Sequence, residues 1–207
     1  MNPELTLLQL RPASVRRARL QLLLIIALFA LPLAVAIGLF GQWRPAGSAE
    51  HGELLNPVRA LSPLSALATD DTPLAPDFLH GRWTLVYVAS GSDCPALCRD
   101  ALWRLRQVRL AIGRDIDRVQ RLALFASMPD DASRQWLARE HPGLAAGAAT
   151  TEARTEFTGG WRTDGRPGGW IYLVDPHDNL VLRYAADGEA GGMLKDLTRL
   201  LKLSQIG

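Results

Sequence analysis

The sequence predicts one α/β domain that is held at a membrane by a single N-terminal transmembrane helix. Two observations predict the domain: strand-like and helix-like segments alternate from Gly81 onward, and 207 residues suffice for one domain with extra segments. The third observation is a run of 19 uncharged, mainly apolar residues from Leu22 to Phe40. A net charge of +2, with the arginines dispersed, argues against a nucleic-acid-binding protein.

The apolar run predicts a transmembrane helix over residues 20–41, because such a helix rises about 28 Å, close to the thickness of a bilayer. Basic residues concentrate before it, at Arg11, Arg16, Arg17 and Arg19. The positive-inside rule therefore places residues 1–19 in the cytoplasm and the domain in the periplasm, at a bacterial inner membrane. A cleaved signal peptide stays open as an alternative, because Ala34-Val35-Ala36 resembles a cleavage site.

The segment after the anchor is expected to be a tether. Residues 42–80 are rich in proline and alanine, and only His51–Val58 is suggestive of a lead-in strand. From residue 81 to 207 the pattern is regular. It predicts strands at 83–89, 120–127, 170–174 and 180–185, and helices at 94–113, 131–140 and 190–203, with 142–169 as a long connection. This order, β-α-β-α-β-β-α, is the thioredoxin-like arrangement.

The two cysteines of the chain, Cys94 and Cys98, are the candidate catalytic residues. They lie where a buried strand ends and a helix begins, so the helix N-terminus favours a thiolate. Positions i and i+4 are neighbours on a helix, so the pair is able to form a disulfide or to hold Cu(I). A static disulfide or two core thiols are the structural alternatives, although so short a loop gives a disulfide little entropic stabilisation.

The stretch from Gly81 to Cys98 resembles the active-site segment of the Sco/SenC family, and Ile171–Leu180 resembles that family's strand-turn-strand. These are membrane-anchored, thioredoxin-like proteins that help to insert copper into cytochrome c oxidase. The resemblance covers roughly Gly81 to Leu203. It implies that Cys94 and Cys98 are the site residues and that copper is the metal.

Two departures set this chain apart from that family. The family's third copper ligand is a histidine shortly before the strand that holds Tyr172, where this chain has Pro167 or a neighbouring glycine or arginine. The proline that usually follows the second cysteine is replaced by Arg99. The chain is therefore expected to be a divergent member that lacks the histidine ligand.

The remaining candidates are considered one by one. His51 is expected to be solvated in the tether, His80 to lie at the surface, His141 to be a cation at a helix C-terminus, and His177 to point away from the cysteines. Met128 is more readily a core residue than a thioether ligand. In the loop before the third strand, Trp161, Arg166 and Trp170 are candidates for a partner-binding surface, with a flexible connection as the alternative.

The sequence thus predicts a factor that assists cytochrome c oxidase assembly by thiol–disulfide exchange, with Cys94 as the attacking thiolate and Cys98 as the resolving one. Its partner would be an oxidase subunit or a copper carrier protein. One alternative is a Cu(I) chaperone in which Cys94 and Cys98 bind the metal with a substitute third ligand. The other is a scaffold without catalytic activity, in which the disulfide is structural.

Overall fold

The computed structural model describes residues 12–39, 51–159 and 169–204, and the chain divides into two compact units, 1–48 and 49–207. The first unit contains helix α1 (Pro12–Leu39), which begins before the predicted span. Within it, Val15–Val35 has a mean hydropathy of 2.2 and no buried residues. By length and composition α1 is a candidate single membrane span, as predicted.

The second unit is built on one seven-stranded sheet in the order β1-β7-β6-β3-β4-β5-β2. Its strands are β1 (Glu53–Ala60), β2 (Ala66–Ala68), β3 (Trp83–Val88), β4 (Val119–Phe125), β5 (Leu144–Ala149), β6 (Trp170–Val174) and β7 (Asn179–Ala185). Its helices are α2 (Ala96–Ala111), the 3-10 helix η1 (Gly113–Arg118), α3 (Asp131–Glu140), α4 (Thr151–Thr158) and α5 (Ala190–Leu203). Strands β3, β4 and β5 are parallel, whereas β6 runs antiparallel to both β3 and β7.

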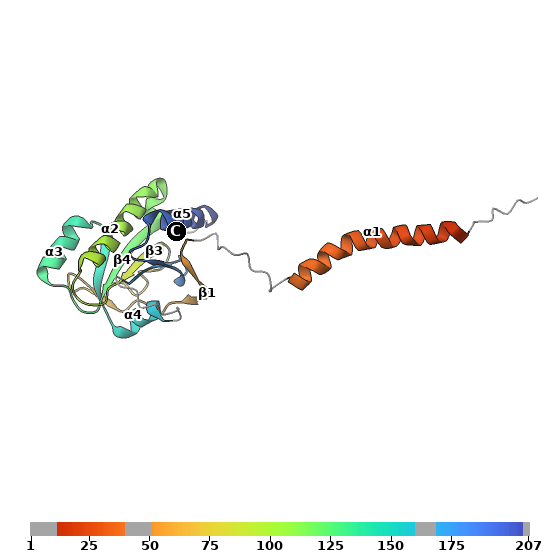
Figure 1. The fold of residues 1–207 in the computed structure, drawn as a ribbon. Helices are drawn as coiled ribbons and strands as arrows, with labels where there is room; N and C mark the ends of the chain where they lie inside the picture. Colours follow the sequence, from red (N-terminus) through yellow and green to blue (C-terminus); the bar gives the residue numbers. More distant parts are fainter. Residues whose placement is uncertain (1–11, 40–50, 160–168, 205–207) are drawn as a thin grey trace, which may run out of the picture. The chain divides into compact units, whose positions relative to one another are not determined.

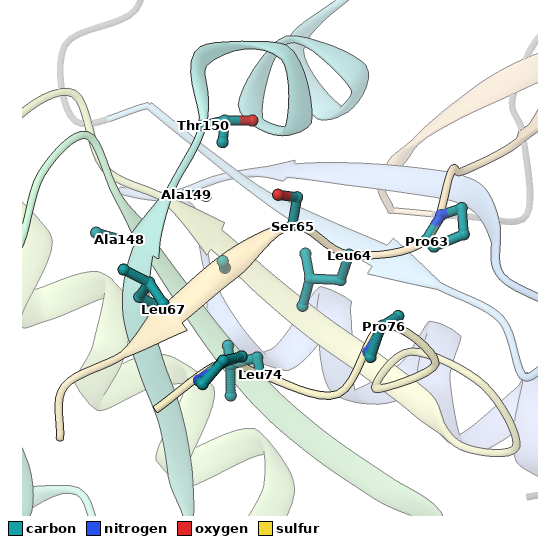
Figure 2. Close-up of a pocket in the computed structure, with 11 residues that line it drawn as sticks. Pro63, Leu64, Ser65, Leu67, Leu74, Pro76, Ala148, Ala149 and Thr150 are labelled. Carbon is teal, nitrogen blue, oxygen red and sulfur yellow. The ribbon is translucent and has the colours of Figure 1, made fainter. Parts of the chain in front are cut away.

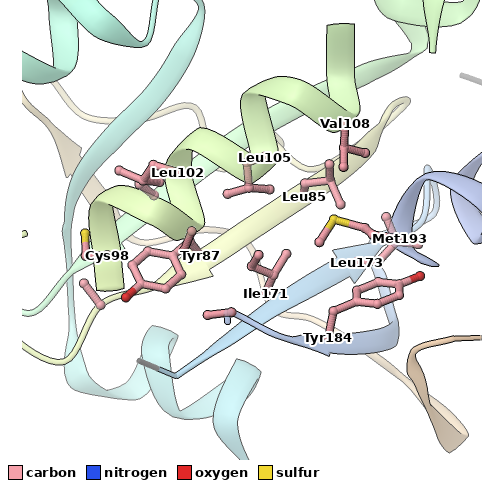
Figure 3. Packing of buried hydrophobic residues seen from close by; sticks show 14 of the residues in the cluster. Leu85, Tyr87, Cys98, Leu102, Leu105, Val108, Ile171, Leu173, Tyr184 and Met193 are labelled. Atoms are coloured by element: carbon pink, nitrogen blue, oxygen red, sulfur yellow. The ribbon is translucent and has the colours of Figure 1, made fainter. Parts of the chain in front are cut away.

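Each face of the sheet has its own apolar core. One face packs against α2, α3 and α5, and its buried side chains include Leu85, Leu102, Leu105 and Leu197. Figure 3 shows this cluster between helix α2 and the strands. The opposite face holds Val86, Tyr172 and Phe157 of α4. Figure 1 shows the same division, with α2, α3 and α5 on one side of the sheet and α4 on the other.

The predicted order β-α-β-α-β-β-α is confirmed as β3-α2-β4-α3-β6-β7-α5. These elements are the ones with strong signals. Strands β3 and β4 are buried along their whole length, which explains their continuous apolar runs. Helix α3 begins where Asp130 accepts a hydrogen bond from the backbone N–H of Ser133, one turn later, in a standard N-cap.

The tether predicted over 42–80 is wrong for much of its length, because β1 and β2 form the two edges of the sheet. Leu55, Leu61 and Leu64 of this segment are buried in the core. An edge strand pairs on one side only and therefore tolerates Pro57, which would break a central strand. The prolines that suggested a tether are thus compatible with edge strands.

His51 is solvated as expected, with its side chain 47% exposed, but it belongs to the folded unit and not to a tether. The carboxylate of Asp196 in α5 accepts hydrogen bonds from the backbone N–H groups of His51 and Gly52, at 2.7 and 3.0 Å. The same carboxylate lies 3.0 Å from Nδ1 of His51 and accepts a hydrogen bond from the Tyr184 hydroxyl at 3.2 Å. Asp196 is 3% exposed, so a buried carboxylate holds the first residues of the domain against α5.

The connection predicted over 142–169 contains β5 and α4, which the sequence did not reveal. Strand β5 is made of alanine, glycine and leucine, without the β-branched residues that mark a strand. Small residues are needed here, because a Cβ on Gly147 would lie 2.0 Å from the carbonyl oxygen of Leu67 in β2. The close approach of β2 therefore selects a composition that looks like a loop.

Strand β2 is kept short by its surroundings. Pro63 precedes it, and Pro73 and Pro76 follow it. These prolines, with Leu74 and Thr150, line an open groove of about 640 Å³ beside the strand, which Figure 2 shows. Short, proline-flanked edge strands are a common way to prevent pairing with other chains.

Candidate functional site

The two cysteines lie at the C-terminal end of β3, where the chain turns into α2. Helix α2 begins at Ala96 after Pro95, so Cys94 lies just outside the helix and Cys98 in its first turn. The structure joins the two residues in a disulfide, with their Cα atoms 5.1 Å apart. The sequence prediction that the pair lies at this junction and is close enough to bond is therefore confirmed.

The disulfide is almost completely covered. Cys94 is 5% exposed and Cys98 is 1% exposed, and both pack in the core on the α2 side of the sheet. Of the two, Cys94 is the more accessible to an approaching thiolate. Next to the pair is a cavity of about 130 Å³, whose walls are Tyr87, Ala89, Ser90, Gly91, Asp93, Pro95, Leu97 and Cys98. This cavity reaches the disulfide on its Cys98 side.

Tyr87 contributes a phenol to the wall of this cavity. Figure 3 shows its ring at the same end of the core as Cys98. Burial raises the pKa of Tyr87, because the charged phenolate would lose its hydration. The side chain therefore stays neutral across the physiological range and presents a hydroxyl rather than a negative charge to the site.

Arg99 places a positive charge against the cysteine loop. Its Nε donates a hydrogen bond to the carbonyl oxygen of Cys94 at 3.1 Å. Its guanidinium lies over the ring of Trp136, 5.0 Å from the ring centre, which holds the side chain in place. A fixed cation beside a thiol favours the thiolate. Sequence reasoning recorded Arg99 only as a departure from a family pattern and missed this contact.

The histidines do not gather at the cysteines. His80 lies in front of β3, at the opposite end of that strand, and its Nδ1 is 2.9 Å from Asp178 in the β6–β7 turn. That turn also contains His177, so His80 is at the surface and His177 is remote from the site, as expected.

His141 differs from the expectation of a helix-end cation. It is only 4% exposed, and its ring packs edge-on against Trp136 with the ring centres 4.8 Å apart. Its pKa is lowered, first by burial and then by the positive charges of Arg121 and Arg106. The ring is therefore neutral at neutral pH, because a buried cation beside two others is unfavourable.

The predicted partner surface is described only in part, because Trp161 and Arg166 lie outside the described residues. Trp170 begins β6, close to the end of β3 that leads to the cysteines. Its ring packs on the α4 side of the sheet, with the Arg183 guanidinium 3.7 Å from its centre. The cysteines pack on the other side, so Trp170 itself is turned away from them.

Residues 83–204 match the family described as "transmembrane-like, thioredoxin-like, C-terminal domain". The chain belongs to this family. The match covers more than half of the 207 residues and includes both cysteines, α2 and the sheet from β3 to β7. None of the curated proteins matches the chain.

Several solved structures share the fold. Yeast Sco1 with copper bound is 17% identical, with a TM-score of 0.56 over 70% of this chain and 95% of Sco1. Apo Sco1 from Thermus thermophilus is 19% identical, with a TM-score of 0.57 over 75% of this chain and 99% of that protein. BsSco, described as having a disulfide switch, is 12% identical, with a TM-score of 0.52 over 73% and 100%. At these identities the likeness establishes a thioredoxin-like fold of the Sco type.

The donor set for copper is incomplete in the part of the chain that the structure describes. No group of three or more histidine, cysteine, aspartate or glutamate side chains gathers there in a way that would hold a metal ion. The two cysteines are bonded to each other, so their sulfurs are not free to bind a metal in this state. The expected place of the family's histidine, at Pro167 or at the neighbouring Arg166 or Gly168, lies outside the described residues. The described residues therefore do not fit a three-ligand copper site.

Proposed function

We propose that this chain is a membrane-anchored thiol–disulfide exchange factor that assists the assembly of a respiratory oxidase in the periplasm. The observation that carries the proposal is the disulfide between Cys94 and Cys98 at the start of α2, beside a cavity and a fixed arginine. The Sco-type fold supports the link to the oxidase, because BsSco is described as a member of a family of cytochrome c oxidase assembly proteins.

The exchange proceeds through two displacements at sulfur. A thiolate of the partner attacks Sγ of Cys94, the cysteine with the larger exposed fraction, so that the Cys94–Cys98 bond breaks and Cys98 leaves as a thiolate. A second thiolate of the partner then displaces Cys94. The partner gains a disulfide and the pair becomes a dithiol. In the reverse direction the reduced pair converts a disulfide of the partner into a dithiol, which is the form able to receive copper.

The surroundings of the pair suit both directions. The first turn of α2, which has no side-chain cap, begins between the two cysteines, and Arg99 adds a full positive charge at the same loop. Both favour the thiolate that acts as the leaving group in one direction and as the nucleophile in the other. The neutral phenol of Tyr87 adds no opposing charge, whereas the carboxylate of Asp93, on the wall of the same cavity, favours the thiol.

The test is the copper content of the oxidase in cells that carry Cys94→Ser or Cys98→Ser in place of the natural chain. We expect either variant to lower oxidase copper loading, whereas His177→Ala, at the remote turn, leaves it unchanged. If Cys94→Ser loads copper normally, the proposal fails.

A Cu(I) titration of the reduced domain against a competing chelator separates exchange from copper carriage. Exchange predicts no binding that competes with the chelator. One tightly bound equivalent that is lost in Cys94→Ser would instead assign the chain as a Cu(I) chaperone with two thiolate ligands.

A further inference from the structure

A group of positively charged side chains lies under α2, away from the cysteines. Arg106 and Arg109 come from α2, Arg121 from β4, and His141 follows the end of α3. Their hydrogen bonds place them together. Arg106 and Arg121 donate to the carbonyl oxygens of Glu140 and Pro142, the residues on either side of His141, and Arg109 donates to that of Val119, two residues before Arg121. We call these four residues the arginine cluster.

The inner members of the cluster are deeply buried and incompletely satisfied. Arg121 is 3% exposed and His141 is 4% exposed. One N–H of Arg121, at Nη2, donates to the carbonyl oxygen of Pro142 at 2.8 Å. Nε and Nη1 of Arg121 and Nδ1 of His141 are buried without a hydrogen-bond partner in the described part of the chain. Buried polar groups are normally paired, so three such atoms in one place require an explanation.

Among the described residues, no carboxylate forms an ion pair with Arg106, Arg109 or Arg121, whose hydrogen bonds go to backbone carbonyls. The pKa of Arg121 is lowered to about 10, first by burial and then by Arg109 and Arg106, and no acidic group opposes these effects. The guanidinium is nevertheless charged at neutral pH. Glu140, whose charge acts on His141, binds Arg139 with its side chain, at 3.1 Å. The cluster thus holds three buried or half-buried cations, and the half-exposed Glu140 carboxylate, which acts on His141, opposes them only in part.

Backbone carbonyl oxygens stabilise part of this positive charge. Arg106 donates to the carbonyl oxygen of Glu140 at 2.7 Å, at the C-terminus of α3, and Arg109 donates to that of Val119 at 2.6 Å. Carbonyls at a helix C-terminus carry partial negative charge and stabilise nearby cations. Partial charges of this kind do not neutralise three full ones, and they leave the free N–H groups of Arg121 unused.

We propose that the arginine cluster is a binding site for a small oxyanion of the phosphate class. The anion enters between Arg106 and Arg109, which are half-buried and form the outer wall. It reaches one of the two unpaired nitrogens of Arg121, Nε or Nη1, which lie on different edges of the guanidinium, and accepts a charge-assisted hydrogen bond from it. Nδ1 of the neutral His141 ring donates a further hydrogen bond. The long side chains of Arg106 and Arg109 shift to admit the anion and close over it.

The test uses the full chain in detergent and compares thermal unfolding in potassium phosphate with that in potassium chloride at equal ionic strength. We expect phosphate to raise the unfolding temperature of the natural chain beyond the general effect of a kosmotropic salt. Arg121→Met replaces the guanidinium by an apolar chain. It should remove the phosphate-specific increase without lowering the unfolding temperature in chloride, because an incompletely paired buried charge has been removed.

Arg118→Met is the matched control. Arg118 also binds backbone carbonyls, those of Leu201 and Ser204, and it pairs with Asp115. Its loss should lower the unfolding temperature equally in both salts and keep the phosphate effect. If Arg121→Met retains the phosphate effect, or if the natural chain unfolds at the same temperature in both salts, the proposal is overturned.

Binding itself is measured by calorimetric titration with inorganic phosphate and with glycerol phosphate, which distinguishes a free anion from the phosphate group of a larger molecule. Binding of either probe supports the site. Should Arg121→Met fail to fold, Arg109→Gln takes its place, since Arg109 is only half-buried. We expect this change to weaken phosphate binding by about tenfold, the loss typical of one charge-assisted contact. Unchanged affinity in Arg109→Gln contradicts the proposal.

Discussion

Replacing Asp196 by alanine tests whether the residues before β1 belong to the folded domain. The carboxylate is 3% exposed and holds His51 and Gly52 by their backbone N–H groups, at 2.7 and 3.0 Å. It also contacts the His51 ring and the Tyr184 hydroxyl, at 3.0 and 3.2 Å. Asp196→Ala removes all four contacts in a single substitution.

The expected loss follows from these contacts. A hydrogen bond to a charged group contributes about 1.5–3 kcal/mol, and contributions at one side chain are not additive. His51 is half-exposed, so water replaces its lost contacts, whereas the hydroxyl of the buried Tyr184 loses its partner within the core. We therefore expect Asp196→Ala to lower the free energy of unfolding by roughly 3–4 kcal/mol, about the cost of losing two hydrogen bonds to a charged carboxylate.

Urea unfolding of residues 49–207, which form a compact unit, measures this change directly. The matched control is Asp117→Ala at an exposed position of η1, where we expect a change within about 0.5 kcal/mol. Amide hydrogen exchange should become faster at His51 and Gly52 in Asp196→Ala. A loss below about 1 kcal/mol, with unchanged exchange at these two amides, would show that the segment is not anchored through Asp196.

Three further predictions concern the site and the sheet. Arg99→Leu should raise the pKa of the reduced cysteine pair by about 0.5–1 unit, seen as slower alkylation at neutral pH, whereas Arg114→Leu, at an exposed position, should not. Gly147→Ala should cost about 1–3 kcal/mol of unfolding free energy, because the new methyl group meets the backbone of β2. Gly191→Ala, in open space on α5, should instead stabilise by about 0.5–1 kcal/mol. The pKa of His141 is lowered in the folded state, so the unfolded state binds more protons on acidification. Stability should therefore fall as the pH drops below about 6.5, and less so in His141→Phe.

The parts of the fold that were predicted correctly are those whose signal is local. Strand β3 is buried on both faces and reads as one apolar run, and α2 shows its buried face at steps of three and four residues. The cysteine pair was located because it lies at the boundary of these two strong elements. Residues four apart at the start of a helix are neighbours, so the sequence alone predicts that Cys94 and Cys98 lie close together.

The parts that were missed depend on tertiary contacts. Strand β5 consists of small residues because β2 approaches it closely, and β1 contains a proline that only an edge strand tolerates. The contact of Arg99 with Trp136 joins α2 to α3. The contact of His51 with Asp196 joins residues that are 145 positions apart in the sequence. Neither contact leaves a periodic trace in the sequence. The arginine cluster likewise combines residues from α2, β4 and the end of α3, whose shared surroundings are set by packing.

The central claim is that the Cys94–Cys98 disulfide exchanges with thiols of partner proteins and is not a purely structural disulfide. The most direct measurement is its reduction potential, obtained by equilibrating residues 49–207 in glutathione buffers and counting alkylated thiols by mass. Exchange predicts a potential above about −300 mV, in the range of disulfides that respond to glutathione. A potential below about −300 mV, with the pair still oxidised in strongly reducing buffer, would assign the bond a structural role and contradict the proposed function.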